Sequence, residues 1–333
     1  MKSKINIQTV SRRGWLKSSA LVLGASVLDV NLVDAASFYE SKTPPLKTGE
    51  ISAIEAAIGK KGIYKEAEAT HTTPLPRNDL KIMIKGEPVP ISFGFGGWVS
   101  IKRTMDGKSA VLMSDCVLLQ EEINPLISAA QANGLEVGAI HNHFFYEEPR
   151  IFYMHIHGMG SPEDLAAKYA KAISETKIAP KNQPPTGLPP AKMGNEIFNV
   201  SQLNGVIKYE AAVNGSTIKY TIGRNDLKVI AMNAEMTTSI GLNTWASFTG
   251  SIEKAHIAGD VAMLDHEVNG VIKALRANNI EVVAVHNHML GDDPHMIFLH
   301  YLGTGNALKL AEGFRAALDQ IGKGRSDQKK MMH

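Results

Sequence analysis

The spacing of apolar residues along this chain predicts both helices and strands. Two segments place apolar residues at i, i+3, i+4 and i+7, the spacing of an amphipathic helix: Ile123, Leu126, Ile127 and Ala130, and later Val268, Val271, Ile272 and Leu275. Further helices fit residues 51–61, 161–173 and 306–318, and short β-like runs between helices predict strands at residues 80–84, 92–102, 109–114, 135–145 and 150–158. We therefore expect an α+β fold with mainly antiparallel sheets and helices packed on one side.

This pattern of elements occurs twice. The sequence RNDLK is found at residues 77–81 and again at 224–228, and the two halves align at nearly this shift. The alignment pairs Trp98 with Trp245, Asp115 with Asp260, Glu122 with Glu267, His141 with His286, His143 with His288, and His155 with His300. The sequence thus predicts two tandem homologous domains, at residues 50–176 and 196–323, joined by a proline-rich linker at 177–195.

The N-terminal segment, residues 1–36, has the layout of an export signal. Paired arginines in SRRGWLK are similar to the twin-arginine export motif, and a modestly apolar stretch and small residues follow. A membrane anchor is the alternative, but polar residues interrupt the stretch, whereas a spanning helix needs about 20 apolar residues. We expect cleavage after Ala35 or Ala36, no stable membrane anchor afterwards, and a periplasmic or secreted protein carried by the twin-arginine export machinery.

Composition narrows the chemistry. The formal net charge of the 333 residues is only +2, which gives no reason to expect nucleic acid or an anionic membrane as a partner. The chain has one cysteine, Cys116, so an internal disulfide and a cysteine-based zinc site are excluded. Any chemistry must come from His, Asp, Glu and Arg side chains.

The duplicated histidines are the strongest candidates for a site. His141 and His143 are two residues apart on a predicted strand, so they share one face, and His155 lies on the next strand. Three imidazoles on paired strands are suited to a divalent metal with an open position for water or substrate, and zinc is favoured over nickel, copper or manganese. We predict one such site per repeat: His141, His143 and His155 in the first, and His286, His288 and His300 in the second. The structural alternative is that these histidines only form hydrogen bonds across strands.

Other duplicated residues fit supporting roles. Glu122 and Glu267 begin the amphipathic helices, where each is a candidate fourth ligand or catalytic base, or simply a partner of the helix dipole. Asp115 and Asp260 fit the role of orienting a ligating imidazole, or of capping a turn. Core packing is the favoured role of Trp98 and Trp245. Arg77 and Arg224 are candidates either to bind the carboxylate of a ligand or to form an ion pair with the aspartate two residues later.

The blocks HNHF…EPRIF…MH and HNHML…DDPHMIFLH, with the helix at residues 308–318, resemble the LppY/LpqO family of exported bacterial proteins. The resemblance covers nearly all of the mature chain and implies no particular activity. This chain lacks the cysteine at which those lipoproteins are anchored. The histidine pattern alone is also similar to that of acetolactate decarboxylase, which holds zinc on β-strands, and this is an analogy of site only.

The sequence therefore predicts an exported, duplicated metal-binding protein as the leading hypothesis. If the protein is an enzyme, a metal-dependent lyase or hydrolase acting on a small molecule is the expected class. The metal would serve as a Lewis acid or activate water. A non-catalytic periplasmic protein that binds metal or a ligand is the alternative. The sequence does not identify the substrate.

Overall fold

The structure, a computed structural model, describes residues 43–323; the predicted signal at 1–36 lies outside them. The first repeat folds in the order α1 (Thr48–Ile58), β1 (Ile63–Lys65), β2 (Thr70–Pro76), β3 (Ile82–Ile84), β4 (Glu87–Val89), η2 (Ile91–Phe93), β5 (Gly96–Arg103), β6 (Ala110–Leu119), α2 (Gln120–Ala132), β7 (Glu136–His141), β8 (Glu147–Glu148), β9 (Ile151–Gly160) and α3 (Pro162–Ile173). The second repeat follows the same plan with α4 (Gly194–Ile197), α5 (Val200–Ile207), β10 (Ala212–Asn214), β11 (Thr217–Gly223), β12 (Val229–Ala231), β13 (Ala234–Met236), η4 (Thr238–Ile240), β14 (Asn243–Gly250), β15 (Ala255–Leu264), α6 (Val268–Ala277), β16 (Glu281–Asn287), β17 (Met296–Gly305) and α7 (Ala307–Leu318).

Each repeat builds one large antiparallel sheet. The strand orders are β1-β2-β5-β6-β9-β7 and β10-β11-β14-β15-β17-β16, so the two sheets correspond strand for strand. In both, the strand after the amphipathic helix forms an edge: β7 pairs with β9, and β16 pairs with β17. These sheets, with their helices, confirm the predicted α+β fold and the tandem duplication.

Local sequence explains where the predicted helices begin and end. Helix α3 begins after Ser161, whose hydroxyl accepts a hydrogen bond from the Asp164 amide at 3.3 Å, with Pro162 in the first turn. Helix α7 begins after Asn306, whose side chain accepts from the next turn in the same way. Because α2 and α6 carry one apolar stripe each, they lie on a sheet with that stripe inward.

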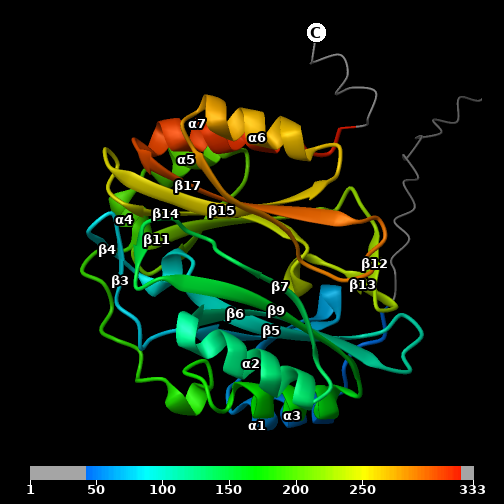
Figure 1. Cartoon of the computed structure of the whole chain (residues 1–333). Coiled ribbons are helices and arrows are strands. Elements are labelled where there is room, and N and C mark those ends of the chain that lie inside the picture. The colour runs from blue at the N-terminus through cyan, green and yellow to red at the C-terminus, as the bar shows by residue number, and fades with distance from the viewer. Residues whose placement is uncertain (1–42, 324–333) are drawn as a thin grey trace, which may run out of the picture. The chain divides into compact units, whose positions relative to one another are not determined.

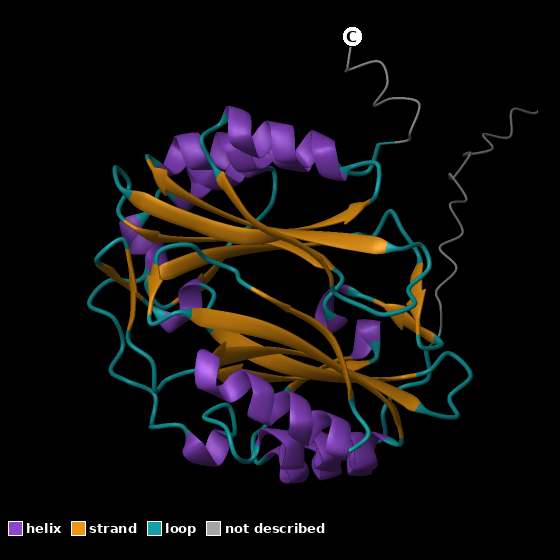
Figure 2. Ribbon diagram, viewed as in Figure 1, coloured by secondary structure: helices purple, strands orange, loops and turns teal. Residues whose placement is uncertain are grey.

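Four layers result, with the two sheets in the middle and helices outside (Figures 1 and 2). Helices α1, α2 and α3 cover the outer face of the first sheet, and α5, α6 and α7 cover that of the second. Apolar side chains from each helical layer and its own sheet form one core per repeat. The inner faces of the two sheets are turned toward each other, which the duplicated sequence did not predict.

The inner layer joins the two repeats, which lie in one compact unit. The β12–β13 hairpin of the second repeat packs with Val111 and Met113 of the first sheet. In the corresponding contact, the β3–β4 hairpin of the first repeat packs with Ala258 and Leu302 of the second sheet. Each repeat therefore completes its inner core with residues of the other, by an approximate twofold relation.

Among residues 43–323, no helix is long and apolar enough to cross a membrane. The proline-rich segment between the repeats contains one short 3-10 helix, Pro180–Asn182, and residues 183–193 contain no helix or strand.

Candidate functional site

The duplicated histidines meet between the two sheets. His155 on β9 pairs in register with Ala139 of β7 on one side and with Asp115 of β6 on the other. The second repeat places His300 between Ala284 and Asp260 in the same way. Because side chains alternate along a strand, His155 and His300 point to the inner faces of their sheets. His141 ends β7, while His143 and its counterpart His288 lie just beyond the strand ends.

The six imidazoles form a single cluster, defined here as His141, His143, His155, His286, His288 and His300. His141 stacks on His286 with ring centroids 3.6 Å apart, across the boundary between the repeats. Two other close contacts between the repeats are His143 with His300 at 3.6 Å and His155 with His288 at 3.8 Å. Within one repeat the rings are farther apart than in these three contacts, for example 4.8 Å between His141 and His155. The two predicted triads are thus brought together and are not separated into two sites.

Among the described residues, each imidazole of the cluster has a ring nitrogen without a hydrogen-bond partner, and Nε2 of His141 and Nε2 of His143 contact each other at 3.1 Å. The Nδ1 atoms of His155 and His300 face the Ser114 and Gly259 carbonyl oxygens at 3.3 and 3.1 Å, so these nitrogens carry the proton. Nδ1 of His286 likewise donates to the Asn287 carbonyl at 2.8 Å. Among the described residues 43–323, no hydrogen-bond partner contacts Nε2 of His155, His286 and His300, or Nδ1 of His141, His143 and His288.

A subset of these nitrogens is close enough to share one ion. His141, His286 and His300 each place a ring nitrogen within 4.8 Å of the other two. This triad combines one histidine of the first repeat with two of the second. His141 and His300 are buried, and His286 is half-buried.

The cluster holds its imidazoles in the neutral form that binds metals. Burial, followed by the proximity of other histidines, lowers the pKa of His141, His143, His155, His288 and His300 well below the ordinary value. Burial also lowers the pKa of His286 to about 4. Protonated rings in such close contact would repel one another, so this arrangement is suited to neutral donors.

Two buried carboxylates adjoin the cluster. Asp115 lies 3.8 Å from Nε2 of His143 and 3.9 Å from Nδ1 of His155, and Asp260 lies 3.8 Å from Nε2 of His300. Both sit on strands and neither caps a turn, in agreement with the predicted position beside an imidazole. Burial raises the pKa of Asp115 to about 7 and that of Asp260 well above the ordinary value. Oδ1 of each has no hydrogen-bond partner within residues 43–323, so each carboxylate keeps one oxygen that is available to a ligand.

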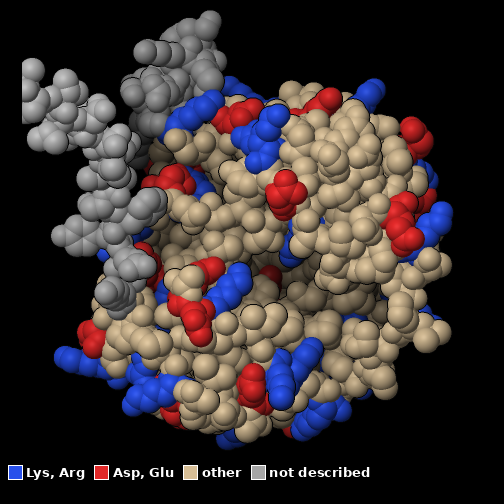
Figure 3. Space-filling view, turned by 180° about the vertical axis from the view of Figure 1, so that it is seen from behind, with Lys and Arg blue, Asp and Glu red and all other residues tan. Residues whose placement is uncertain are grey.

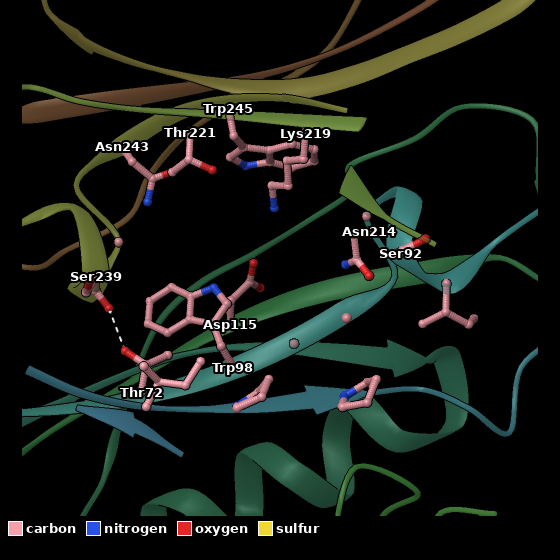
Figure 4. A pocket seen from close by; sticks show the side chains of 18 of the residues that line it. Thr72, Ser92, Trp98, Asp115, Asn214, Lys219, Thr221, Ser239, Asn243 and Trp245 are labelled. Carbon is pink, nitrogen blue, oxygen red and sulfur yellow. Dashed lines mark hydrogen bonds between the residues drawn. The ribbon is translucent and has the colours of Figure 1, made fainter. Parts of the chain in front are cut away.

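A cavity of about 680 Å³ lies between the sheets and reaches the cluster at Asp115, Asp260 and His288, which line it. Trp98 rises into it from the first sheet, and Trp245 and Lys219 descend from the second (Figure 4). The surface seen from behind is hollowed near its middle, with positive and negative side chains interspersed around it (Figure 3). Both tryptophans are half-buried and form walls of the cavity as well as packing contacts. The core packing predicted for them is therefore only part of their role.

Glu122 and Glu267 are not brought to the histidines. Glu122 receives a hydrogen bond from Arg77 at 2.8 Å and from the amides of Leu119 and Lys177 at 2.8 Å each. Arg77 is fully buried and also pairs with Asp79, which connects the RNDLK turn to the start of α2. The second repeat has the same arrangement around Glu267. The carboxylates are therefore used in helix-start ion pairs, and the ligand or base role predicted for them does not match their contacts.

Two inner-face residues escaped the sequence prediction. Lys219 occupies the position of Thr72 in the first repeat, five residues before the RNDLK sequence, so a search restricted to duplicated residues misses it. His157, whose counterpart is Leu302, is not duplicated either; it is fully buried, and burial lowers its pKa to about 4. A signal was available in the alternation of β9, which puts His157 on the same face as His155.

Comparison with known proteins supports the duplication. A family model described as a domain of unknown function (DUF1259) matches the chain twice, over residues 52–175 and 201–320. None of the functionally curated proteins matches it. Among solved structures, a trimeric bacterial microcompartment shell protein, PduB, is similar at 12% identity over 78% of this chain and 93% of that one; its TM-score of 0.19 is too low to carry an argument. With two matches that together cover most of its length, the chain belongs to the DUF1259 family.

Proposed function

We propose that this protein binds a divalent metal in the histidine cluster and uses it on a small molecule held in the adjoining cavity. One observation carries the proposal: six imidazoles meet between the sheets, and each keeps one ring nitrogen without a hydrogen-bond partner among residues 43–323. An unpaired polar atom in a protein interior costs free energy, about 1–3 kcal/mol for each. Six of them in one place are explained by a shared ligand, and His155, His286 and His300, which carry their proton on Nδ1, offer it the lone pair of Nε2.

The donor set favours zinc. His141, His286 and His300 supply the closest group of nitrogens, and neutral imidazoles are common zinc ligands. Backbone carbonyl groups accept hydrogen bonds from Nδ1 of His286 and of His300. Such bonds fix the tautomer of a histidine and leave its Nε2 able to bind a metal. Whether the cluster holds one ion or the two that the sequence predicts is decided by the measured stoichiometry.

The cavity favours a catalytic role over storage. Bound metal would polarise a carbonyl or lower the pKa of water, which supports lyase or hydrolase chemistry. Asp115 and Asp260 line the cavity beside the cluster, and a carboxyl group with a raised pKa suits proton transfer near neutral pH. These aspartates replace Glu122 and Glu267 as the candidates for that step.

A non-catalytic metal-binding or ligand-binding protein is the second candidate. It is favoured by the position of Glu122 and Glu267, the duplicated acids first considered as bases, which are held in ion pairs away from the cluster. Incubating the metal-loaded protein with a small-molecule extract separates the two. A compound consumed by the wild type and spared by Asp260→Asn supports catalysis, whereas binding without consumption supports the second candidate.

Export is the proposed setting for either role. The paired arginines and apolar stretch of residues 1–36 support passage through the twin-arginine route, which carries folded proteins. The resemblance to the exported LppY/LpqO family supports the same location.

Metal content of the purified protein tests the proposal. After reloading with zinc and removal of excess ion, the wild type should hold at least about one equivalent, as three-imidazole sites do. His141→Ala and His300→Ala should each lose most of it. His71→Ala is the matched control, because His71 is a buried histidine outside the cluster that contacts Glu55. A wild type without stoichiometric metal, or full retention in both cluster variants, would overturn metal binding.

A further inference from the structure

Lys219 breaks the approximate symmetry of the cavity. Its counterpart in the first repeat, Thr72, is an uncharged residue that donates to the Ser239 carbonyl at 3.1 Å and contacts the Ser100 hydroxyl at 2.7 Å. Lys219 instead extends from β11 into the cavity, with Nζ 4.4 Å from the centroid of the Trp245 ring (Figure 4). The second sheet thus presents a positive charge where the first presents a neutral side chain.

This charge has no close anionic partner within the described residues. None of the ion pairs within 4.0 Å among residues 43–323 includes Lys219. Burial lowers its pKa, and Asp115 and Asp260 attract it from a longer distance. Those two carboxylates also face the histidine cluster, so a bound divalent cation would compete with Lys219 for their charge.

Two more lysines line the same cavity. Lys60 and Lys65 line it together with Lys219, and the Lys65 ammonium lies 3.7 Å from the Glu68 carboxylate. These three lysines outnumber Asp115 and Asp260, the two carboxylates that line the same space of about 680 Å³. Because burial also raises the pKa of both aspartates, the balance of charge favours a negatively charged occupant. The walls formed by Trp98 and Trp245 favour a flat body beside that charge.

We propose that the cavity binds a small carboxylate with a flat, unsaturated or aromatic body, and that Lys219 anchors its carboxylate. A cavity of this size suits a small molecule. An anchor on β11 leaves the rest of the molecule directed toward Asp115, Asp260 and His288 at the cluster end of the space. This inference rests on the proposed function for its chemical purpose, but the binding of the carboxylate is measured independently of the metal.

Matched pairs of probes test the charge requirement. Benzoate and acetate carry the carboxylate, and benzamide and acetamide are their neutral counterparts of similar shape. Titration calorimetry on the whole protein, zinc-loaded and again after chelation, gives the dissociation constants. In zinc-loaded wild type, benzoate should bind at least about tenfold more tightly than benzamide, the scale of one hydrogen bond between charged groups.

Variants assign that preference to Lys219. Lys219→Met should weaken benzoate binding by about tenfold to a hundredfold and change benzamide binding by less than about twofold. Lys219→Arg should keep part of the preference because it keeps the charge. Lys108→Met is the matched control, since Lys108 is exposed in the turn between β5 and β6 and should leave both constants unchanged.

The outcomes separate this inference from the proposed function. Equal binding of acid and amide by the wild type, no binding of either carboxylate, or benzoate binding that survives Lys219→Met overturns the carboxylate anchor. If Lys219→Met loses benzoate but keeps its zinc, the anchor is supported and the metal site is intact. If the wild type holds no zinc, the proposed function fails, while preference for benzoate that depends on Lys219 in the same protein still supports the anchor.

Discussion

Replacing Glu267 by alanine tests whether this carboxylate supports the fold or the chemistry. Its side chain is fully buried at the start of α6 and accepts four hydrogen bonds. Arg224 provides two of them, from Nη1 at 2.8 Å and Nη2 at 3.2 Å. The backbone amides of Leu264 and Gly322 provide the others, at 2.7 Å each. All four contacts are structural, so the change should lower stability without removing the metal.

The size of the loss follows from what alanine leaves behind. Breaking a buried ion pair by removing one partner costs about 3–5 kcal/mol, because the other charge stays buried. Arg224 would keep its two contacts with Asp226, at 2.9 Å each, which places the expected cost of the lost charge near the lower limit. Two amides lose their acceptor as well, and each adds about 1 kcal/mol or more if water cannot replace it. We therefore expect the free energy of unfolding to fall by about 4 kcal/mol.

Urea unfolding followed by circular dichroism measures this change. With a slope of about 2–3 kcal/mol per molar urea, the midpoint should fall by more than about 1 M. Glu267→Gln keeps an acceptor oxygen and should lose about half as much, while the exposed Glu253→Ala should change little. Zinc per folded molecule should stay at the wild-type value. Loss of zinc from a Glu267→Ala protein of normal stability would refute the reasoning and restore Glu267 as a ligand or base.

Two further changes test the inner layer. Lys102 is 1% exposed, and burial lowers its pKa to about 8. Between about pH 8 and 10.5 this lysine is therefore protonated in the unfolded chain but not in the folded protein, so the free energy of unfolding should rise with pH across this window. Lys102→Met should remove this rise. From the size of the pKa shift, it should also stabilise the protein by about 3 kcal/mol at pH 7. An unchanged pH profile in unfolding experiments would contradict this expectation. Gly241 has φ +97°, and a Cβ there would lie 3.0 Å from His288 and 3.1 Å from Trp98, so Gly241→Ala should cost about 1–3 kcal/mol. Gly205→Ala, in an exposed helical position with open space, should be neutral or stabilising by up to about 1 kcal/mol, and equal effects at both glycines would exclude the steric explanation.

Much of each repeat could be predicted from residue spacing. The helical stripe that ends at Ala130 and the caps at Ser161 and Asn306 depend on local chemistry, and the structure has helices there. The alternation along β7 and β9 correctly put His141 and His155 on one face of a sheet, whereas His143, expected on the same strand, lies beyond the end of β7. What spacing could not show is which surface that face would meet, because a two-residue period distinguishes the faces of a strand but not their partners.

The same limit explains the candidate site. Aligning the two halves identified all six histidines of the cluster, but it suggested two triads because each half was considered alone. The alignment also directed attention to Glu122 and Glu267, whose duplication reflects a repeated ion pair with Arg77 and Arg224. It missed Lys219 for the opposite reason, since a residue that serves one shared cavity needs to be present only once.

The interlocked inner layer gives a physical reason for the presence of two copies. The His141–His286 stack crosses the boundary between the repeats, and each hairpin core is completed by the other sheet. One repeat alone would expose an apolar inner face and only three of the imidazoles, so folding of the pair and assembly of the cluster are coupled. In a cluster on an approximate twofold axis, one sheet can also vary without displacing the histidines. Thr72 in one sheet and Lys219 in the other illustrate this freedom: the shared residues supply the proposed metal ligands, and the unshared lysine supplies the proposed selectivity.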